Sequence, residues 1–250
     1  MQIAVLTKLI PNPEATPRLD ADGLLVREGG VLDPGDEFGL ELALQLVESS
    51  GGEVTVVSMG PDEALAGVQR ALAMGAHKAV LVTDPALRGA DALVTARVLA
   101  AAIAWQPADL VVAGAESTDG YTGTMPVTIA ELLGMASVTA ARALTTDGDG
   151  FRIERQTESG YDVLRSPSPT LVTVTAGATE PRYPSLKGIM AAKSKPVERL
   201  TTADLGVGDL AATQSVAAVT DAPPKAGGEI ITGDDAVTRI ADLLAEAKVI

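Results

Sequence analysis

Residues 53–82 read EVTVVSMGPDEALAGVQRALAMGAHKAVLV. Within this stretch a strand-like hydrophobic pattern is followed by a helical one and then by a second strand-like one. Glu53–Ser58 is rich in β-branched residues, which predicts a buried strand, and Ala79–Val82 predicts the next strand. Between them apolar residues recur at helical spacing, with Asp62 as the expected N-cap and Gly75 as the expected end. A strand, a helix and a second strand in this order predict two parallel strands joined by a crossover.

The same alternation covers the chain up to about residue 136. The other expected strands are Ile3–Leu6 and Leu110–Ala113, and the other expected helices are Phe38–Glu48, Asp91–Trp105 and Thr124–Leu133. Strands that alternate with helices of this length predict an open, mostly parallel sheet with helices on both faces, which is an α/β fold.

After about residue 136 the pattern changes to short strand-like segments separated by turn residues. These segments are Arg142–Thr145, Phe151–Thr157, Tyr161–Ser166 and Leu171–Thr175. Because the chain has no helical pattern between them, we expect two antiparallel strand pairs appended to the sheet.

The C-terminal part of the chain predicts an extended arm. It holds no sustained hydrophobic period before residue 233 and includes Pro223-Pro224. An amphipathic helix follows, capped by Asp234 or Asp235, and it needs either its own domain or a partner to pack on. The expected domains are an α/β domain at 1–200 and an arm with its helix at 201–250.

The composition excludes several classes of function. Of the 250 residues 46% are hydrophobic but only 2% are aromatic, so we expect a large aliphatic core. The absence of cysteine and the single histidine, His77, exclude disulfides and the usual thiolate or multi-histidine metal sites. A net charge of −14 argues against non-specific nucleic-acid binding. No signal-peptide pattern and no run of ~20 apolar residues is present, so a cytoplasmic protein is expected.

Three loops mark the expected ligand site. In an open parallel sheet, ligands bind outside the carboxyl ends of the strands, where the strand order reverses. The loops that leave such ends are Thr7–Glu37, Ser58–Asp62 and Gly114–Thr124. The first is long for a strand-to-helix connection, which is typical of functional or disordered loops, and it ends in Asp33-Pro34-Gly35-Asp36-Glu37.

The third loop (Gly114–Thr124) carries the strongest local signal for a ligand. It combines glycines with hydroxyl side chains directly before a helix N-terminus, and the hydroxyls belong to Ser117, Thr118, Thr122 and Thr124. Such groups can form an anion site, although a helix cap of the same composition is a competing interpretation. Neither G-x-G-x-x-G after the first strand nor G-x-x-x-x-G-K-[ST] occurs, which disfavours a Rossmann dinucleotide site and a P-loop.

Residues 179–195 read TEPRYPSLKGIMAAKSK and follow the β-forming run TLVTVT. Pro181 and Pro184 each remove a backbone donor and favour extended geometry before them, which predicts a stiff exposed loop carrying Leu186. Between residues 181 and 199 five basic side chains accompany one glutamate. A basic segment with an apolar tip on an acidic protein suggests a docking surface, and a solvated loop before a linker is the alternative.

This segment closely resembles the signature N-E-P-R-[YF]-P-S-[LF]-x-[GN]-I-M-x-A-K-x-K of electron-transfer flavoprotein beta subunits. Thr179 stands where Asn is usual, and the rest of Glu180–Lys195 largely fits. The resemblance extends along the whole chain, and the run Ser117–Gly120 (STDG) is similar to the actinobacterial branch of the family.

The resemblance implies an adenine-nucleotide alpha-hydrolase-like fold, with a nucleotide-binding domain at 1–200, and a heterodimer with an alpha subunit. The arm and helix at 201–250 would contact that subunit. AMP would bind this chain, and FAD would be held mainly by the alpha subunit near the interface. The implied adenine pocket consists of Leu6, Asp33, Pro34, Gly35, Asp36, Val57 and Met59. The implied phosphate and ribose ligands are Gly114, Ser117, Thr118, Asp119, Gly120, Tyr121, Thr122, Gly123 and Thr124. The implied docking residues of the recognition loop (179–195) are Arg182, Tyr183, Leu186, Ile189 and Met190.

The resemblance further implies a bacterial electron carrier rather than an enzyme. It would accept electrons from acyl-CoA and other dehydrogenases, as in fatty acid beta-oxidation, and pass them through FAD toward a quinone oxidoreductase. Two positions depart from the family: Gly35 stands where an aromatic residue is frequent, and Gln156 stands where a glutamate faces the alpha subunit. The alternatives are a flavin-bifurcating beta subunit with a second FAD and a stand-alone nucleotide sensor like universal stress proteins.

Overall fold

The computed structural model describes residues 1–208, 210–220 and 227–249, and Pro223-Pro224 of the predicted arm lies outside these ranges. The chain divides into two compact units, Met1–Ser215 and Val216–Ile250. The first unit therefore extends beyond the expected domain end at residue 200. The side chains of Asp84 and Asp91 explain this, because they accept hydrogen bonds from Thr202 and Thr213 respectively.

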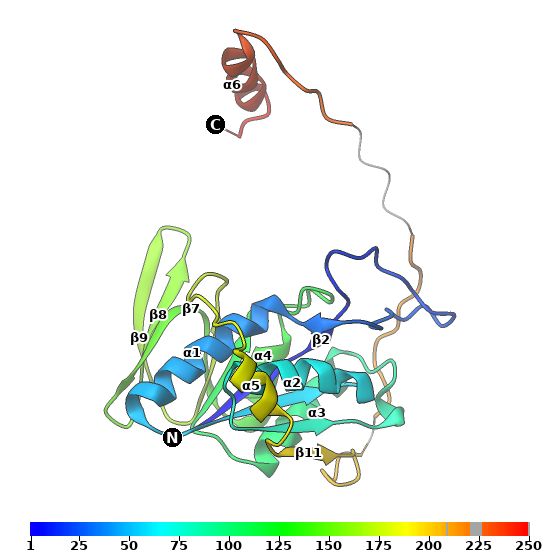
Figure 1. Cartoon of the computed structure of the whole chain (residues 1–250), viewed down its shortest axis with the longest axis vertical. Helices are drawn as coiled ribbons and strands as arrows, with labels where there is room; N and C mark the ends of the chain where they lie inside the picture. The colour runs from blue at the N-terminus through cyan, green and yellow to red at the C-terminus, as the bar shows by residue number, and fades with distance from the viewer. Residues whose placement is uncertain (209, 221–226, 250) are drawn as a thin grey trace. The chain divides into compact units, whose positions relative to one another are not determined.

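The first unit is built on a nine-stranded sheet (Figure 1) with the order β11-β5-β4-β1-β6-β10-β7-β8-β9. In chain order the strands are β1 (Gln2–Thr7), β4 (Glu53–Met59), β5 (Lys78–Val82), β6 (Leu110–Gly114), β7 (Ala136–Asp147), β8 (Gly150–Thr157), β9 (Gly160–Pro167), β10 (Thr170–Val174) and β11 (Val197–Leu200). Strands from β11 to β7 pair in parallel, and β7, β8 and β9 pair antiparallel. The predicted open, mostly parallel α/β sheet is confirmed.

Helices cover both faces of this sheet. They are α1 (Pro34–Ser50), α2 (Leu65–Met74), α3 (Ala92–Trp105), α4 (Met125–Leu133) and the short α5 (Leu186–Ala192). Ile3 and Val5 of β1 pack in one core with α1 and α2, while Ala4 and Leu6 pack in a second core with α3 and α4. Both cores are almost wholly aliphatic, and each buried Leu, Ile or Val contributes about 1.5–3 kcal/mol.

The expectation of two antiparallel strand pairs is wrong. Strand β10 lies between β6 and β7 and is parallel to both, and the antiparallel part is a three-stranded meander of β7, β8 and β9. All five residues of β10, TLVTV, are buried, which is typical of a central parallel strand. Its closeness in sequence to the preceding hairpin was the misleading signal.

The expected helix ends are correct at two places and wrong at one. Asp91 caps α3 by accepting a hydrogen bond from Val94, and Gly75 ends α2. Asp62 does not cap α2, because a turn of 3₁₀-helix, Asp62–Ala64, precedes it, and the Asp62 carboxylate instead accepts a hydrogen bond from Arg199 at 2.6 Å. At the far end of α3 lies Trp105, the only tryptophan of the chain, whose exposed fraction is 48%.

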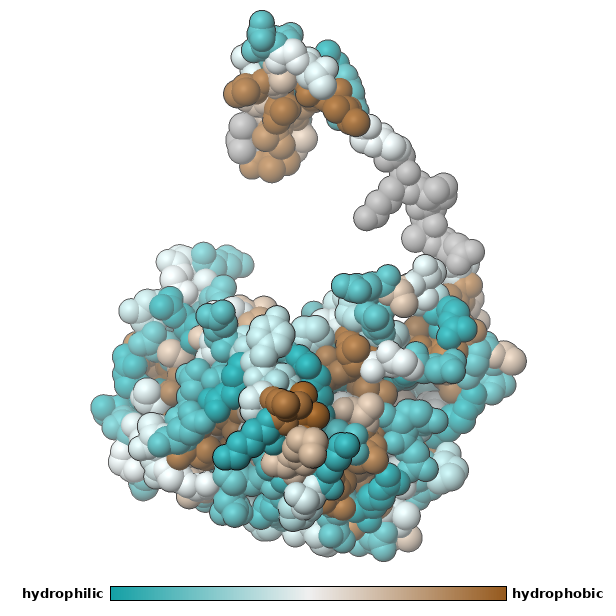
Figure 2. Space-filling model, in the orientation of Figure 1, coloured by the Kyte–Doolittle hydropathy of each residue, from teal (hydrophilic) through white to brown (hydrophobic). Residues whose placement is uncertain are grey.

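The second unit contains one amphipathic helix, α6 (Ala236–Glu246), with Asp235 at its N-cap position. Its apolar side chains are exposed, and they include Val237, Ile240, Leu243 and Leu244. Hydrophobic surface on this helix is visible in Figure 2. Among the described residues no helix is both long and apolar enough to cross a membrane.

Asp91 gives a test of how the end of the first unit is held. Its carboxylate accepts hydrogen bonds from the N–H of Val94 and from the N–H and hydroxyl of Thr213, which lower the pKa of Asp91 from 3.8 to about 2 although partial burial opposes this. Since the pKa is lower in the folded state, the stabilisation is complete above about pH 3.8 and is lost as the pH falls through about 2. We therefore expect Asp91→Asn to lower the urea midpoint at pH 7.

The difference in urea midpoint between wild type and Asp91→Asn should shrink steadily from pH 4 to pH 2. Asp149→Asn is the matched control, because Asp149 lies exposed in the turn between β7 and β8 and its substitution removes the same charge. A pH-independent difference between wild type and Asp91→Asn would contradict the assignment.

Candidate functional site

The strand order reverses at β1, which has β4 on one side and β6 on the other. The connection after β1 leads to α1 on one face, and the third loop after β6 leads to α4 on the opposite face. The carboxyl ends of β1 and β6 therefore lie at a switch point, the place where open α/β sheets bind ligands in a crevice (the switch-point crevice). The first and third loops meet there, as the sequence predicts.

Asp33 joins these two loops. Its side chain is fully buried and caps α1 by accepting a hydrogen bond from Gly35 N at 2.9 Å. The second carboxylate oxygen accepts hydrogen bonds from the N–H of Thr118 at 2.8 Å and from its hydroxyl at 3.2 Å. One buried side chain thus sets both the first turn of α1 and the path of the third loop.

Asp36, in the first turn of α1, holds the ends of the two central strands. Its carboxylate accepts a hydrogen bond from Lys8 N, directly after β1, at 2.8 Å. A Cβ atom at Gly114 would lie 2.9 Å from the other Asp36 oxygen, so only glycine fits at the end of β6. Burial and the nearby charge of Asp33 raise the pKa of Asp36 well above its usual range, against the hydrogen bonds from Lys8 and Gly114.

Asp119 of the third loop binds two cations that sequence reasoning missed. Lys8 Nζ lies 2.5 Å from Asp119 Oδ1 and 3.2 Å from the hydroxyl of Ser117, and Arg27 Nη2 lies 2.7 Å from Asp119 Oδ2. Burial raises the pKa of Asp119, but the hydrogen bonds and charges of Lys8 and Arg27 outweigh it and lower that pKa overall. The available signal was the position of both cations in the long first loop of an acidic chain.

The first loop contains short structure of its own. Strands β2 (Leu9–Ile10) and β3 (Val31–Leu32) form a separate antiparallel pair, and α1 already begins at Pro34. The segment Pro34–Glu37 is therefore the first helical turn rather than a loop.

The remaining predicted ligand-binding residues lie either in the central strands or in the third loop. Leu6 and Val57 are buried on the α3 and α4 face, and Met59 is partly buried against the same core. Tyr121 has a positive φ of 47° and an exposed fraction of 69%. Thr124 occupies the N-cap position of α4 without a side-chain cap, so the first N–H groups of α4 are available to a ligand.

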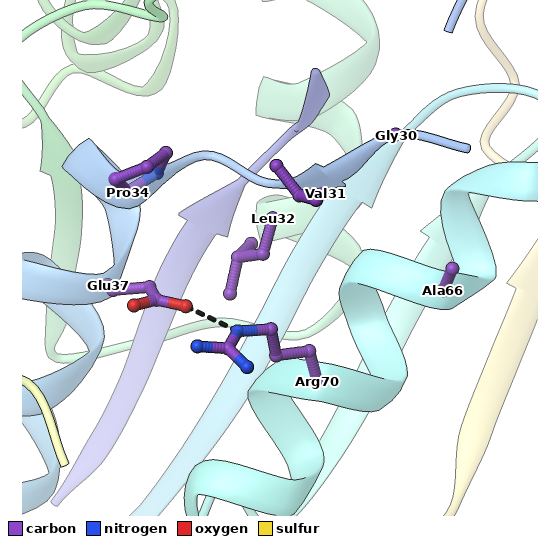
Figure 3. Close-up of a pocket in the computed structure, with 7 residues that line it drawn as sticks. All are labelled: Gly30, Val31, Leu32, Pro34, Glu37, Ala66 and Arg70. Atoms are coloured by element: carbon purple, nitrogen blue, oxygen red, sulfur yellow. Dashed lines mark hydrogen bonds and ion pairs between the residues drawn. The ribbon is translucent and has the colours of Figure 1, made fainter. Parts of the chain in front are cut away.

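A cavity of about 320 Å³ lies between β3, the first turn of α1 and the start of α2 (Figure 3). It is lined by Gly30, Val31, Leu32, Pro34, Glu37, Ala66 and Arg70. Glu37 of α1 and Arg70 of α2 form an ion pair of 2.5 Å across it. The cavity shares only Pro34 with the predicted nucleotide residues.

The recognition loop carries a group of exposed apolar side chains. The exposed fraction is 88% for Tyr183 and 77% for Leu186, and Ile189 and Met190 of α5 are also exposed. Where α5 lies in Figure 1, Figure 2 shows hydrophobic surface next to hydrophilic side chains. Arg182 differs from these four predicted docking residues, because its guanidinium binds the carboxylates of Glu41 and Glu48 on α1.

Comparison with known proteins places the chain in a family. The family model described as "Electron transfer flavoprotein domain" matches residues 22–205. A protein of Mycobacterium leprae named "Electron transfer flavoprotein subunit beta" is 39% identical over 99% of both chains. A protein of the same name from Thermoanaerobacterium thermosaccharolyticum is 37% identical over the full length of both. The "Caffeyl-CoA reductase-Etf complex subunit CarD" of Acetobacterium woodii is 35% identical over 99% of this chain and 98% of its own.

The fold is that of an open, mostly parallel α/β protein whose strand order reverses at β1. The chain belongs to the electron transfer flavoprotein family, and the resemblance to beta subunits inferred from residues 179–195 is confirmed. Membership places it among proteins of flavin-linked electron transport.

The pairing of Asp119 with Lys8 and Arg27 can be tested without a ligand. Asp119→Asn removes the charge that holds both cations, so the free energy of unfolding should fall by about 1–2 kcal/mol and trypsin should cleave faster after Arg27. Glu116→Gln is the matched control, because Glu116 is an exposed carboxylate of the same loop. Equal cleavage rates after Arg27 in the two variants would show that Asp119 does not hold the first loop.

Proposed function

We propose that this chain is the beta subunit of a heterodimeric electron transfer flavoprotein, that it binds AMP at the switch-point crevice, and that it docks to acyl-CoA or similar dehydrogenases through its recognition loop. Electrons would pass through an FAD held mainly by the alpha subunit toward a quinone oxidoreductase. The chain would carry out no bond-making chemistry itself and would act in the bacterial cytoplasm.

The observation that carries the nucleotide part of this proposal is the convergence of the first and third loops at the switch point. Asp33 links the two loops, and the uncapped N-terminus of α4 presents N–H groups beside Thr122 and Gly123. Backbone donors at a helix N-terminus suit a phosphate group. Lys8 and Arg27 neutralise Asp119, so the third loop does not repel an anion at that position.

The adenosine part of AMP would lie at the carboxyl ends of the central strands. Met59 is partly exposed there and packs against the core that contains the buried Leu6 and Val57, and apolar surface suits a purine ring. Hydroxyls of the third loop can bind ribose oxygens. The side chain of Asp33 already has three hydrogen-bond partners, so its role toward a nucleotide would be to order the loops rather than to bind the ligand.

A flavin-bifurcating beta subunit is the second candidate function. The observation that favours it is the similarity to the Etf subunit of a caffeyl-CoA reductase complex. In that case a second FAD would replace AMP in this chain. The stand-alone nucleotide sensor is disfavoured, because family membership and the exposed apolar side chains of α6 both point to a partner subunit.

The nucleotide content of the complex decides between these candidates. The chain should be co-expressed with its neighbouring alpha subunit, and the purified heterodimer denatured to release its ligands for chromatography. We expect one FAD and one AMP per heterodimer. Two FAD without AMP would assign the bifurcating function, and no nucleotide at all would contradict both proposals.

Leu186 tests the docking part of the proposal. Its side chain is largely exposed, and burying a leucine contributes about 1.5–3 kcal/mol, which corresponds to roughly ten- to hundredfold in affinity. Leu186→Ala should therefore raise the KM of the assembled complex for an acyl-CoA dehydrogenase by about tenfold or more while its FAD content stays unchanged. An unchanged KM would remove the docking role.

A further inference from the structure

The start of the recognition loop is attached to α1 by a multidentate ion pair. Arg182 Nε and Nη2 donate hydrogen bonds to the two carboxylate oxygens of Glu41 at 2.8 and 3.0 Å, and the backbone N–H of Arg182 donates a third at 3.2 Å. Arg182 Nη1 and Nη2 also donate to Glu48 at 2.5 and 3.1 Å. The planar guanidinium therefore binds two carboxylates that lie seven residues apart on one face of α1.

The partner of Arg182 at Glu41 is the more deeply placed of the two. The side chain of Glu41 has an exposed fraction of only 4%, and burial alone would raise its pKa. The hydrogen bonds from Arg182 and Gln45 overcome this and lower the pKa of Glu41, while both carboxylates raise the pKa of Arg182. A buried carboxylate is unstable without a cationic or hydrogen-bonding partner, so the burial of Glu41 keeps Arg182 at this position.

The end of the loop is attached to α2. Lys195 Nζ donates hydrogen bonds to the carbonyl oxygens of Leu72 at 2.8 Å and Ala76 at 2.6 Å. The last turn of α2 has no basic residue of its own, so Lys195 supplies the cation that favours a helix C-terminus. Burial lowers the pKa of Lys195.

Between the two attachments, α5 lies directly on α2. A Cβ atom at Gly188 would come within 2.3 Å of the carbonyl oxygen of Ala73, so the two helices approach at backbone distance. Ser185 caps α5 by accepting a hydrogen bond from Gly188 N at 3.0 Å. With this side of α5 against α2, Leu186 and Met190 remain exposed.

Because of these attachments, not all basic side chains of the recognition loop are available to a partner protein. Arg182 and Lys195 are engaged within the chain, and the basic side chains of the loop that remain exposed are Lys187 and Lys193. The two engaged cations are therefore poorly placed to meet a partner protein. Their contacts instead order the segment that carries the exposed apolar residues.

We propose that Arg182 and Lys195 are positioning residues for electron transfer. They act through α1 and α2 rather than by contact with the electron donor, and they hold α5 in the conformation that presents Leu186. An unattached loop would have to be ordered when the donor docks, and this entropy cost would weaken the encounter. The inference rests on the proposed docking function, and its first test is independent of any donor.

The decisive variant is Glu41→Gln/Glu48→Gln, because it weakens the hold on Arg182 while every residue of the recognition loop stays unchanged. In the assembled complex we expect trypsin to cleave after Lys187 several times faster than in wild type. Lys195→Met should have the same effect, and Lys193→Met is its matched control, since Lys193 is exposed and lies in the same segment. Glu41→Gln/Glu48→Gln and Lys195→Met are the two anchor variants. An unchanged rate of cleavage after Lys187 in both of them would overturn the proposal.

The second measurement uses an acyl-CoA dehydrogenase as electron donor. Both anchor variants should raise the KM for this donor by about tenfold with kcat unchanged. Arg182→Ala should also raise the KM for this donor. Arg182→Lys keeps the charge but not the planar guanidinium, so it should raise the KM less than Arg182→Ala does. If Arg182 bound the donor directly, releasing it in Glu41→Gln/Glu48→Gln would lower the KM or leave it unchanged, and the positioning role would be wrong.

Leu186→Ala separates the two proposals. A raised KM in Leu186→Ala together with a wild-type KM in both anchor variants would overturn the positioning role and leave docking intact. A wild-type KM in Leu186→Ala would contradict the docking function, and the rate of cleavage after Lys187 would then decide whether the anchors hold the loop.

Discussion

A single buried carboxylate, that of Asp33, connects the two halves of the sheet at their centre. It caps α1 and at the same time binds the backbone and the hydroxyl of Thr118. Since α1 covers one face and the third loop leads to the helix on the opposite face, this contact joins the connections that follow β1 and β6. Without it Thr118 would lose its partner, and the neighbouring Asp36 would lose the register that brings it to Lys8.

The same helix reaches the second functional region. Its first turn carries Asp36, and its later turns carry Glu41 and Glu48, which bind Arg182 of the recognition loop. The switch point and the recognition loop are thus both attached to one helix of 17 residues. The local sequence predicts only an amphipathic helix here. The functions of its buried acidic residues could not be predicted, because their partners lie far away in the sequence.

Local patterns predicted the parts of this fold that depend on neighbours in sequence. The alternation of strands and helices up to residue 136, the cap at Asp91 and the end of α2 at Gly75 follow from hydrophobic periodicity and backbone preferences. The place of β10 in the sheet does not, since pairing with β6 is a contact between residues some sixty positions apart in the chain. The third loop is predicted as a ligand loop from its glycines and hydroxyls, whereas Lys8 and Arg27 became visible only through their contact with Asp119.

The placement of Trp105 has a practical consequence for spectroscopy. As the only tryptophan, it lies at the end of α3 that is remote from Asp91 and from the carboxyl edge of the sheet, and about half of its side chain meets solvent. Intrinsic fluorescence therefore reports on the opposite edge of the molecule, where it will follow global unfolding. It will report little on a ligand at the carboxyl edge of the sheet, and a reporter for such binding has to be introduced. The absence of cysteine makes any engineered thiol a unique labelling position.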